Sequence, residues 1–149
     1  MTKAILLVED NASDEKLTIL AFKGSGIANE VVVERDGAAA LDYLFATGNH
    51  QKRDGSVLPA VILLDLQLPR IDGLEVLRRI RTDERTRLIP VVVLTSSKQE
   101  EDVIRSYSLG ANAYVRKPVD FTEFAAAAKT LGLFWLLLNE PAPVGHRPA

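Results

Sequence analysis

Short apolar runs recur along this chain, and stretches with the helical spacing of apolar residues separate them. The runs are rich in Val, Ile and Leu, which is typical of strands buried on both faces of a sheet. Strands that alternate with helices favour a parallel sheet covered by helices on both faces, so we expect a doubly wound (βα)5 α/β fold. The predicted strands are 4–8, 30–34, 60–64, 89–94 and 113–115.

The helices are marked by apolar residues three and four positions apart. Asn11 or Ser13 can cap the first helix, and Gly24 ends it. The second strand carries a glutamate at each end, which places it near an edge of the sheet. The polar stretch 47–57 is expected to form a loop longer than most α/β connections. The other predicted helices are 38–45, 74–81, 99–109 and 122–139.

The last predicted helix has apolar residues on two faces. Leu133, Leu136 and Leu137 fall nearly opposite the face expected to pack on the core, where a surface helix is normally polar. Because exposed apolar patches usually mark interfaces, we expect a homodimer contact there, with packing inside the monomer as the alternative. The face expected to join the core holds Phe124, Ala127, Ala128, Leu131, Trp135 and Leu138.

Composition narrows the classes of function. The 149 residues are expected to form one domain, 1–140, followed by a disordered tail, 141–149, which contains three prolines. The formal net charge of -2 argues against nucleic-acid binding. The absence of cysteine excludes disulfides and thiolate chemistry. We see no secretory signal, and the longest apolar stretch, 131–138, is far shorter than the roughly 20 residues that span a bilayer, so we expect a cytoplasmic protein.

Polar residues follow four of the five predicted strands. Glu9 and Asp10 follow the first strand, Asp65 the third, Thr95 the fourth and Lys117 the fifth. Because the carboxyl ends of parallel strands form the crevice where open α/β sheets bind ligands, these side chains are expected to converge. Each acid taken singly could instead be a solvated loop residue or a helix cap. Together they suit a divalent cation and a phosphoryl group.

Three carboxylates at one edge repel one another unless positive charge lies among them. Lys117 supplies one positive charge, and a divalent cation would supply two. Mg²⁺ prefers octahedral oxygen ligands and keeps several waters, so one or two carboxylates and a backbone carbonyl are enough protein ligands.

Asp65 is the best candidate for a nucleophile, because a carboxylate that attacks phosphorus gives an acyl phosphate. A metal ion and Lys117 could then cover two oxygens of the transferred group, and the Thr95 hydroxyl could hydrogen-bond the third. X–Pro bonds are the only ones whose cis form is cheap. A cis Lys117–Pro118 bond is therefore a candidate means of turning the lysine into the crevice, with a trans turn as the alternative.

Four segments carry a resemblance to a known family. They are Leu-Val-Glu-Asp-Asn at 7–11, Leu-Leu-Asp-Leu-Gln-Leu-Pro at 63–69 with Asp72-Gly73, Leu-Thr-Ser at 94–96, and Tyr-Val-Arg-Lys-Pro at 114–118. In this order and at these spacings, the chain resembles the receiver domain of two-component response regulators over nearly its whole length. The resemblance implies a flavodoxin-like sheet with strand order 2-1-3-4-5.

The resemblance also implies roles for single residues. Asp65 would accept a phosphoryl group from a phosphohistidine of a sensor histidine kinase. The protein would then be a phosphoacceptor rather than an enzyme, although self-phosphorylation from phosphodonors and autodephosphorylation are expected. Asp10, Asp65 and the main-chain carbonyl of Gln67 would bind Mg²⁺, with Glu9 acting through water. Thr95 would move toward the phosphoryl group and Tyr114 would follow, switching the surface formed by the fourth helix, fifth strand and fifth helix.

The chain end resembles a narrower group. The segment 131–141, together with the long loop 47–57, resembles the single-domain regulators paired with bacterial phytochromes. A light-regulated histidine kinase is the implied phosphodonor.

Two other classes of protein stay open at this stage. A haloacid dehalogenase-type phosphatase uses the same groups, but it places its nucleophile, and a second Asp two residues later, after the first strand; here position 67 is Gln. An inactive receiver-like binding scaffold would usually lose the phosphoacceptor, the acid pair or the lysine, and this chain keeps all of them. Nucleotide binding is disfavoured, because no glycine-rich phosphate loop follows the first strand.

Overall fold

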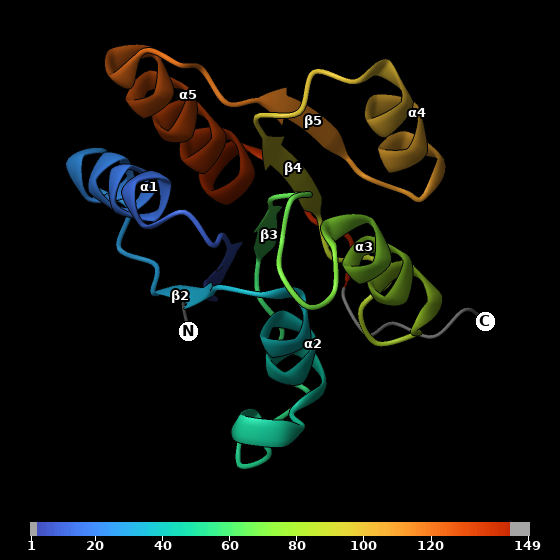
Figure 1. Ribbon diagram of the computed structural model, residues 1–149. Helices are drawn as coiled ribbons and strands as arrows, with labels where there is room; N and C mark the ends of the chain where they lie inside the picture. The colour runs from blue at the N-terminus through green and yellow to red at the C-terminus, as the bar shows by residue number, and fades with distance from the viewer. Residues whose placement is uncertain (1–2, 144–149) are drawn as a thin grey trace.

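The structure, a computed structural model, describes residues 3–143. Its sheet is parallel and five-stranded, with the order β2-β1-β3-β4-β5, which confirms the expected doubly wound fold (Figure 1). The second strand lies at an edge, as its flanking charges predicted. The strands are β1 (Ile5–Val8), β2 (Val31–Glu34), β3 (Val61–Leu64), β4 (Val91–Thr95) and β5 (Ala113–Arg116).

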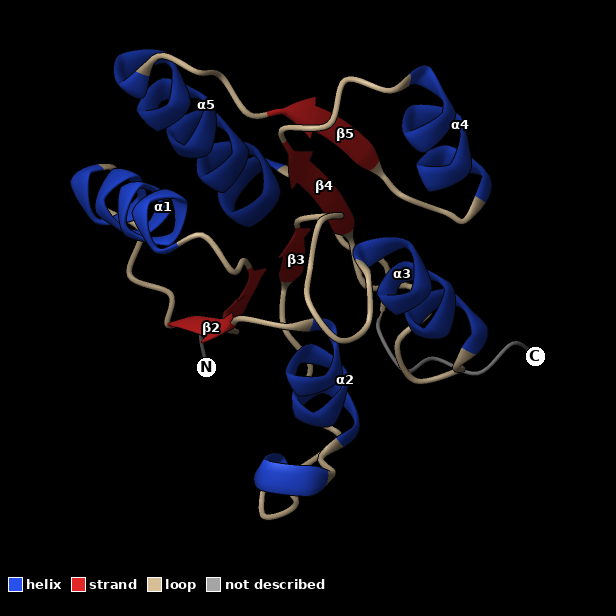
Figure 2. Cartoon of the chain, viewed as in Figure 1, coloured by secondary structure: helices blue, strands red, loops and turns tan. Residues whose placement is uncertain are grey.

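Helices cover both faces of the sheet (Figure 2). One pair packs together on one face, and the other three cover the opposite face. The predicted long loop contains a short 3-10 helix, Gly48–His50. The helices are α1 (Ala12–Gly24) and α5 (Phe121–Leu133) on the first face, and α2 (Gly37–Phe45), α3 (Gly73–Thr82) and α4 (Glu100–Ser108) on the second.

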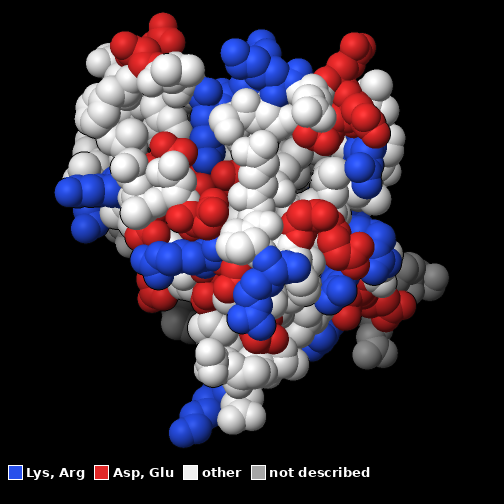
Figure 3. Space-filling model, in the orientation of Figure 1, with Lys and Arg blue, Asp and Glu red and all other residues white. Residues whose placement is uncertain are grey.

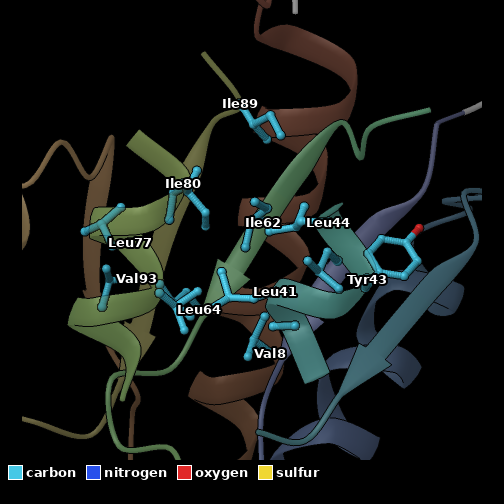
Figure 4. Close-up of a cluster of buried hydrophobic side chains, with 14 of the residues drawn as sticks. Val8, Leu41, Tyr43, Leu44, Ile62, Leu64, Leu77, Ile80, Ile89 and Val93 are labelled. Atoms are coloured by element: carbon cyan, nitrogen blue, oxygen red, sulfur yellow. The ribbon is translucent and has the colours of Figure 1, made fainter. Parts of the chain in front are cut away.

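Two hydrophobic cores sandwich the sheet because its inner strands are apolar on both faces. The larger core lies between the sheet and α2 and α3, where Leu41 and Ile80 meet Ile62, Leu64 and Val93 (Figure 4). Each such side chain contributes roughly 1.5–3 kcal/mol when fully buried. These cores hold the strand ends in a fixed register, which positions the side chains that follow them.

Side-chain caps begin four of the helices. Asn11 caps α1, since its side-chain oxygen accepts from Asp14 N at 2.9 Å, and the alternative cap, Ser13, lies inside the helix. Asp36, Asp72 and Asp120 cap α2, α3 and α5 in the same way. Each cap contributes about 1 kcal/mol and fixes where the helix begins.

The last helix differs from the sequence prediction. After Leu133 the chain continues as a π-helix, Phe134–Leu138, closed by Asn139 N donating to Phe134 O at 2.7 Å. The wider turn changes which side chains face the core. The expected outward position of Leu136 was wrong, because this residue packs on the core, and Leu138, expected in the core, is 75% exposed.

The apolar side chains exposed at this end of the molecule are therefore Phe134, Leu137 and Leu138, while Leu133 is half-buried. Among the described residues one helical stretch, Phe121–Leu138, is long and apolar enough to cross a membrane by length and composition alone. This is weak evidence, because the stretch packs beside α1 against the sheet, where Gly132 lies close to Phe22 and Ile27. Most of the expected disordered tail, residues 144–149, lies outside the described residues.

Candidate functional site

The five residues expected at the strand ends come together at the carboxyl edge of the sheet. Asp65 follows β3 and Lys117 follows β5, and backbone bonds hold both in place: Asp65 N donates to Val8 O at 3.1 Å and Lys117 N to Thr95 O at 2.7 Å. A pocket of about 400 Å³ opens at this edge. It is lined by Asp10, Asn11, Asp14, Asp65, Gln67, Ser96 and Lys117.

Asp65 is buried, at 6% exposed, and both of its carboxylate oxygens have donors. Its Oδ1 accepts from Thr95 Oγ1 at 2.9 Å and from Gln67 N at 3.1 Å. Its Oδ2 lies 2.9 Å from Lys117 Nζ. These contacts fix the orientation of the carboxylate, which is what a nucleophile at this position requires.

Lys117 is the only cation that lines this pocket in the described part of the chain, and its side chain is 6% exposed. Its ammonium lies 2.6 Å from Glu9 Oε1 and 2.9 Å from both Asp65 Oδ2 and Asp14 Oδ2. Burial alone would lower the pKa of Lys117, but the hydrogen bonds and charges of Glu9 and Asp65 raise it above its usual value. The ammonium is therefore permanently charged at neutral pH.

The carboxylates outnumber this single ammonium. Glu9, Asp10 and Asp65 each offer an oxygen within 4.8 Å of the others, and Asp14 shares Lys117. Burial raises the pKa of Glu9 to about 7, although Lys117 opposes the shift. The excess of negative charge in an oxygen-rich pocket fits a hard divalent cation.

Acidic atoms gather on this face in the space-filling view, in the region between α1 and the loops that follow β3 and β4 (Figure 3). Tight backbone packing shapes the side of the pocket formed by the loop after β3. A Cβ on Gly73, the first residue of α3, would lie 2.3 Å from the carbonyl oxygen of Asp65. Only glycine lets α3 begin so close to the site.

Asp14 belongs to the site but was not predicted from the sequence. An acid in the first turn of a helix is favoured by the helix dipole alone, so Asp14 carries no distinctive sequence signal of its own. The available signal was its place in the first turn of the helix that begins directly after Glu9 and Asp10, since this turn starts at the same edge of the sheet.

Tyr114 lies beside the site rather than in it. Its hydroxyl donates to the Ser97 carbonyl at 3.2 Å, and Ser97 Oγ donates to Asp102 Oδ2 of α4 at 2.6 Å. The half-buried ring lines a groove with residues of α4 and β5. Tyr114 thus connects the loop after Thr95 to the surface of α4 and β5.

Of the two forms that the sequence left open for the bond before Pro118, the structure has the trans form and not the cis candidate. Peptide bonds are trans throughout the described residues, the Lys117–Pro118 bond included. Trans is the cheaper form even before proline. The Lys117 side chain reaches all three carboxylates without a cis turn, because the Lys117 backbone is already held by Thr95 O at the end of β4.

Comparison with known proteins agrees with this geometry. The response regulator receiver domain family matches residues 5–129. The chain is similar to response regulator Rcp1 of Synechocystis sp., with 42% identity over 134 residues, which cover 90% of this chain and 89% of Rcp1.

Solved structures of such proteins superimpose on nearly the whole chain. The Mn²⁺-bound form of Rcp1 has a TM-score of 0.88 at 39% identity and covers 94% of this chain and 99% of its own. The phosphorylated cyanobacterial phytochrome response regulator RcpA also has a TM-score of 0.88 at 39% identity, covering 95% and 99%. The bacteriophytochrome response regulator RtBRR is 56% identical with a TM-score of 0.76, covering 97% and 86%.

The matched family, the strand order and the acids, hydroxyl and ammonium at the strand ends lead to one conclusion. The chain belongs to the response regulator receiver domain family of two-component signalling.

Proposed function

We propose that Asp65 accepts a phosphoryl group from a phosphohistidine of a sensor histidine kinase. The observation that carries the proposal is the pairing at Asp65, where Thr95 Oγ1 and Lys117 Nζ each lie 2.9 Å from a different carboxylate oxygen. A general scaffold has no need of a buried carboxylate whose donors sit where a phosphoryl group would need them.

In the transfer, an Asp65 oxygen forms a bond to phosphorus while the phosphorus–nitrogen bond of the phosphohistidine breaks. The imidazole leaves with the electron pair, and Asp65 becomes an acyl phosphate. The Asp65 oxygen that is bonded to phosphorus accepts hydrogen bonds less well than a free carboxylate oxygen. Lys117 and Thr95 then donate to the phosphoryl oxygens, where the negative charge of the transferred group lies.

The residues at the site fit Mg²⁺ as the resident cation. Asp10, Asp65 and the Gln67 main-chain carbonyl would hold it, and Glu9 would act through water. When bound, Mg²⁺ supplies positive charge to the phosphoryl oxygens. Support comes from the carboxylate oxygens within 4.8 Å of one another and from the Mn²⁺-bound structure of Rcp1.

Phosphorylation would be read through Thr95 and Tyr114. Once Thr95 turns from Asp65 Oδ1 to a phosphoryl oxygen, the loop after β4 shifts toward the site. The Ser97 carbonyl that accepts from Tyr114 lies in this loop, so Tyr114 would lose its present partner and rotate inward. The groove between α4 and β5 would change with it.

The phosphodonor that we propose is a histidine kinase of the phytochrome type, in the cytoplasm. Its support is the similarity to RcpA and RtBRR, which are phytochrome and bacteriophytochrome response regulators.

Intact mass after incubation with Mg²⁺ and acetyl phosphate tests the phosphoacceptor. Wild-type protein is expected to gain one phosphoryl group only when Mg²⁺ is present, and Asp65→Asn to gain none while keeping its circular dichroism. Labelling of Asp65→Asn at the wild-type level would refute the assignment. No labelling of folded wild-type protein would favour the binding scaffold. Transfer from a labelled bacteriophytochrome kinase, compared with transfer from an unrelated kinase, tests the donor.

A further inference from the structure

Asp14 brings a fourth carboxylate to the pocket, beyond those assigned to the metal and the phosphoryl group. It lies in the first turn of α1, where its backbone N–H donates to Asn11 Oδ1 at 2.9 Å. Its Oδ2 lies 2.9 Å from Lys117 Nζ, and its side chain is 24% exposed against 6% for Asp65. Asp14 therefore lines the same pocket as Asp65 and is the more exposed of the two.

Asp14 also takes part of the charge of Lys117. An ammonium has three N–H donors, and here Glu9, Asp14 and Asp65 accept them. The bond to Asp14 directs one donor away from Asp65, toward α1. A phosphoryl group that arrives at Asp65 thus meets an ammonium that is already shared with Asp14. It also meets the negative charge of Asp14, which lies on the other side of that ammonium from the Asp65 oxygen.

We propose that Asp14 sets the donor preference of phosphoryl transfer to Asp65, by disfavouring phosphodonors of high negative charge. The inference rests on the function proposed above. Near neutral pH acetyl phosphate carries two negative charges, whereas phosphoramidate carries one net negative charge because its nitrogen is protonated. In both reactions the Asp65 oxygen–phosphorus bond forms, and acetate or ammonia leaves with the electron pair. A phosphohistidine, whose leaving group is an imidazole, resembles the second donor more than the first.

The charge of Asp14 can be removed without removing its contact to Lys117. Asp14→Asn keeps an oxygen acceptor, so the ammonium stays in place, and only the negative charge is lost. At saturating Mg²⁺ and low salt, we expect the rate of phosphoryl gain from acetyl phosphate to rise about three- to ten-fold. The rate from phosphoramidate should rise by a smaller factor, so the ratio of the two rates increases, and high salt should reduce the increase.

The rates are measured by intact mass for wild type, Asp14→Asn and two further variants. Glu123→Gln, in the exposed first turn of α5, makes the same change in net charge outside the pocket and should leave the ratio unchanged. Asp14→Ser is a second neutral variant and should move the ratio in the same direction as Asp14→Asn.

An unchanged ratio in both Asp14 variants would overturn the inference, as would an equal fall with both donors, which would mean that Asp14 only supports the structure. Wild-type protein must be labelled in either case. Absence of that label would instead mean that the proposed function has failed.

Discussion

The contacts of Asp65 position its carboxylate for the proposed attack on phosphorus. Thr95 and Lys117 hold its two oxygens, and Gln67 adds a backbone donor. Lys117 is shared with Glu9 and Asp14, so one ammonium faces several carboxylates at this site. Burial raises the pKa of Glu9, which is 2% exposed, and the nearby charge of Asp65 adds to the shift. The groups that suit a cation and a phosphoryl group therefore destabilise the protein without them.

At this scale we predict a pH dependence of stability. Because the pKa of Glu9 rises from 4.5 to about 7 on folding, the folded protein binds more protons than the unfolded chain between these values. The stability that Glu9 contributes is complete below pH 4.5 and is lost as the pH rises through 7, by at most about 3 kcal/mol. Urea unfolding without Mg²⁺ between pH 5 and 8 should show a flatter curve for Glu9→Gln than for wild type.

Saturating Mg²⁺ is the control for this measurement, because a cation at the site favours the ionised carboxylate and should reduce the difference between the two proteins. Parallel curves for wild type and Glu9→Gln without Mg²⁺ would show that Glu9 titrates normally.

Among the elements, the connection between β3 and α3 has the largest part in shaping the site. Asp72 caps α3, and the helix begins at Gly73, against the backbone of Asp65 and Leu66. A Cβ on Gly37, at the start of α2, would likewise overlap the backbone of Ile71 in the same loop. Two glycines thus let two helix ends pack against the loop that carries Gln67 and the backbone of Asp65.

We predict that Gly73→Ala damages both stability and phosphorylation. Its Cβ would lie 2.3 Å from the carbonyl oxygen of Asp65 and 2.6 Å from Leu66 Cα, so the backbone must move. Denaturant unfolding should show a loss of roughly 1–3 kcal/mol, typical of overpacking. The phosphorylation rate should fall as well.

Gly24→Ala is the matched control. It lies at the end of α1, and an added Cβ there meets no atom within 4 Å. That variant should be neutral or more stable by about 0.4–1 kcal/mol and should phosphorylate normally. Equal stability of the two variants would mean that the loop after β3 can move to accommodate the added Cβ at little cost in free energy.

At the scale of the whole molecule, the last helix ends in an exposed apolar surface. Phe134, Leu137 and Leu138 are exposed apolar side chains of the π-helix that follows α5. We propose that they form a homodimer contact, because surface patches of this kind usually mark interfaces. The change from the expected Leu133, Leu136 and Leu137 follows from the π-helix.

The double variant Leu137→Asp/Leu138→Asp should sediment as a monomer if wild type is a dimer. Two buried carboxylates without partners would cost an interface far more than the lost apolar area. Leu20→Asp, on α1 and 54% exposed, is the control and should leave the mass unchanged. A mass for the double variant equal to that of wild type would remove this end of the helix from the interface.

The sequence alone was sufficient for the sheet and for the five residues that gather at the strand ends, whereas it left Asn11 and Ser13 as alternative caps of α1. These features depend on short-range patterns: an apolar run makes a buried strand, and a parallel sheet brings all of its carboxyl ends to one edge. The resemblance to receiver domains supplied the strand order and the expected roles of Gln67 and Tyr114, which no local pattern reveals.

Only the tertiary structure decided which partners these residues take. Asp14 and Lys117 are 103 positions apart, and they meet because α1 packs at the same edge as the end of β5. The π-helix after Leu133 changed the exposed set, because an ideal period of 3.6 no longer applies there. A sequence specifies periodicity and residue type locally, whereas ion-pair partners and exposure depend on where the whole chain packs.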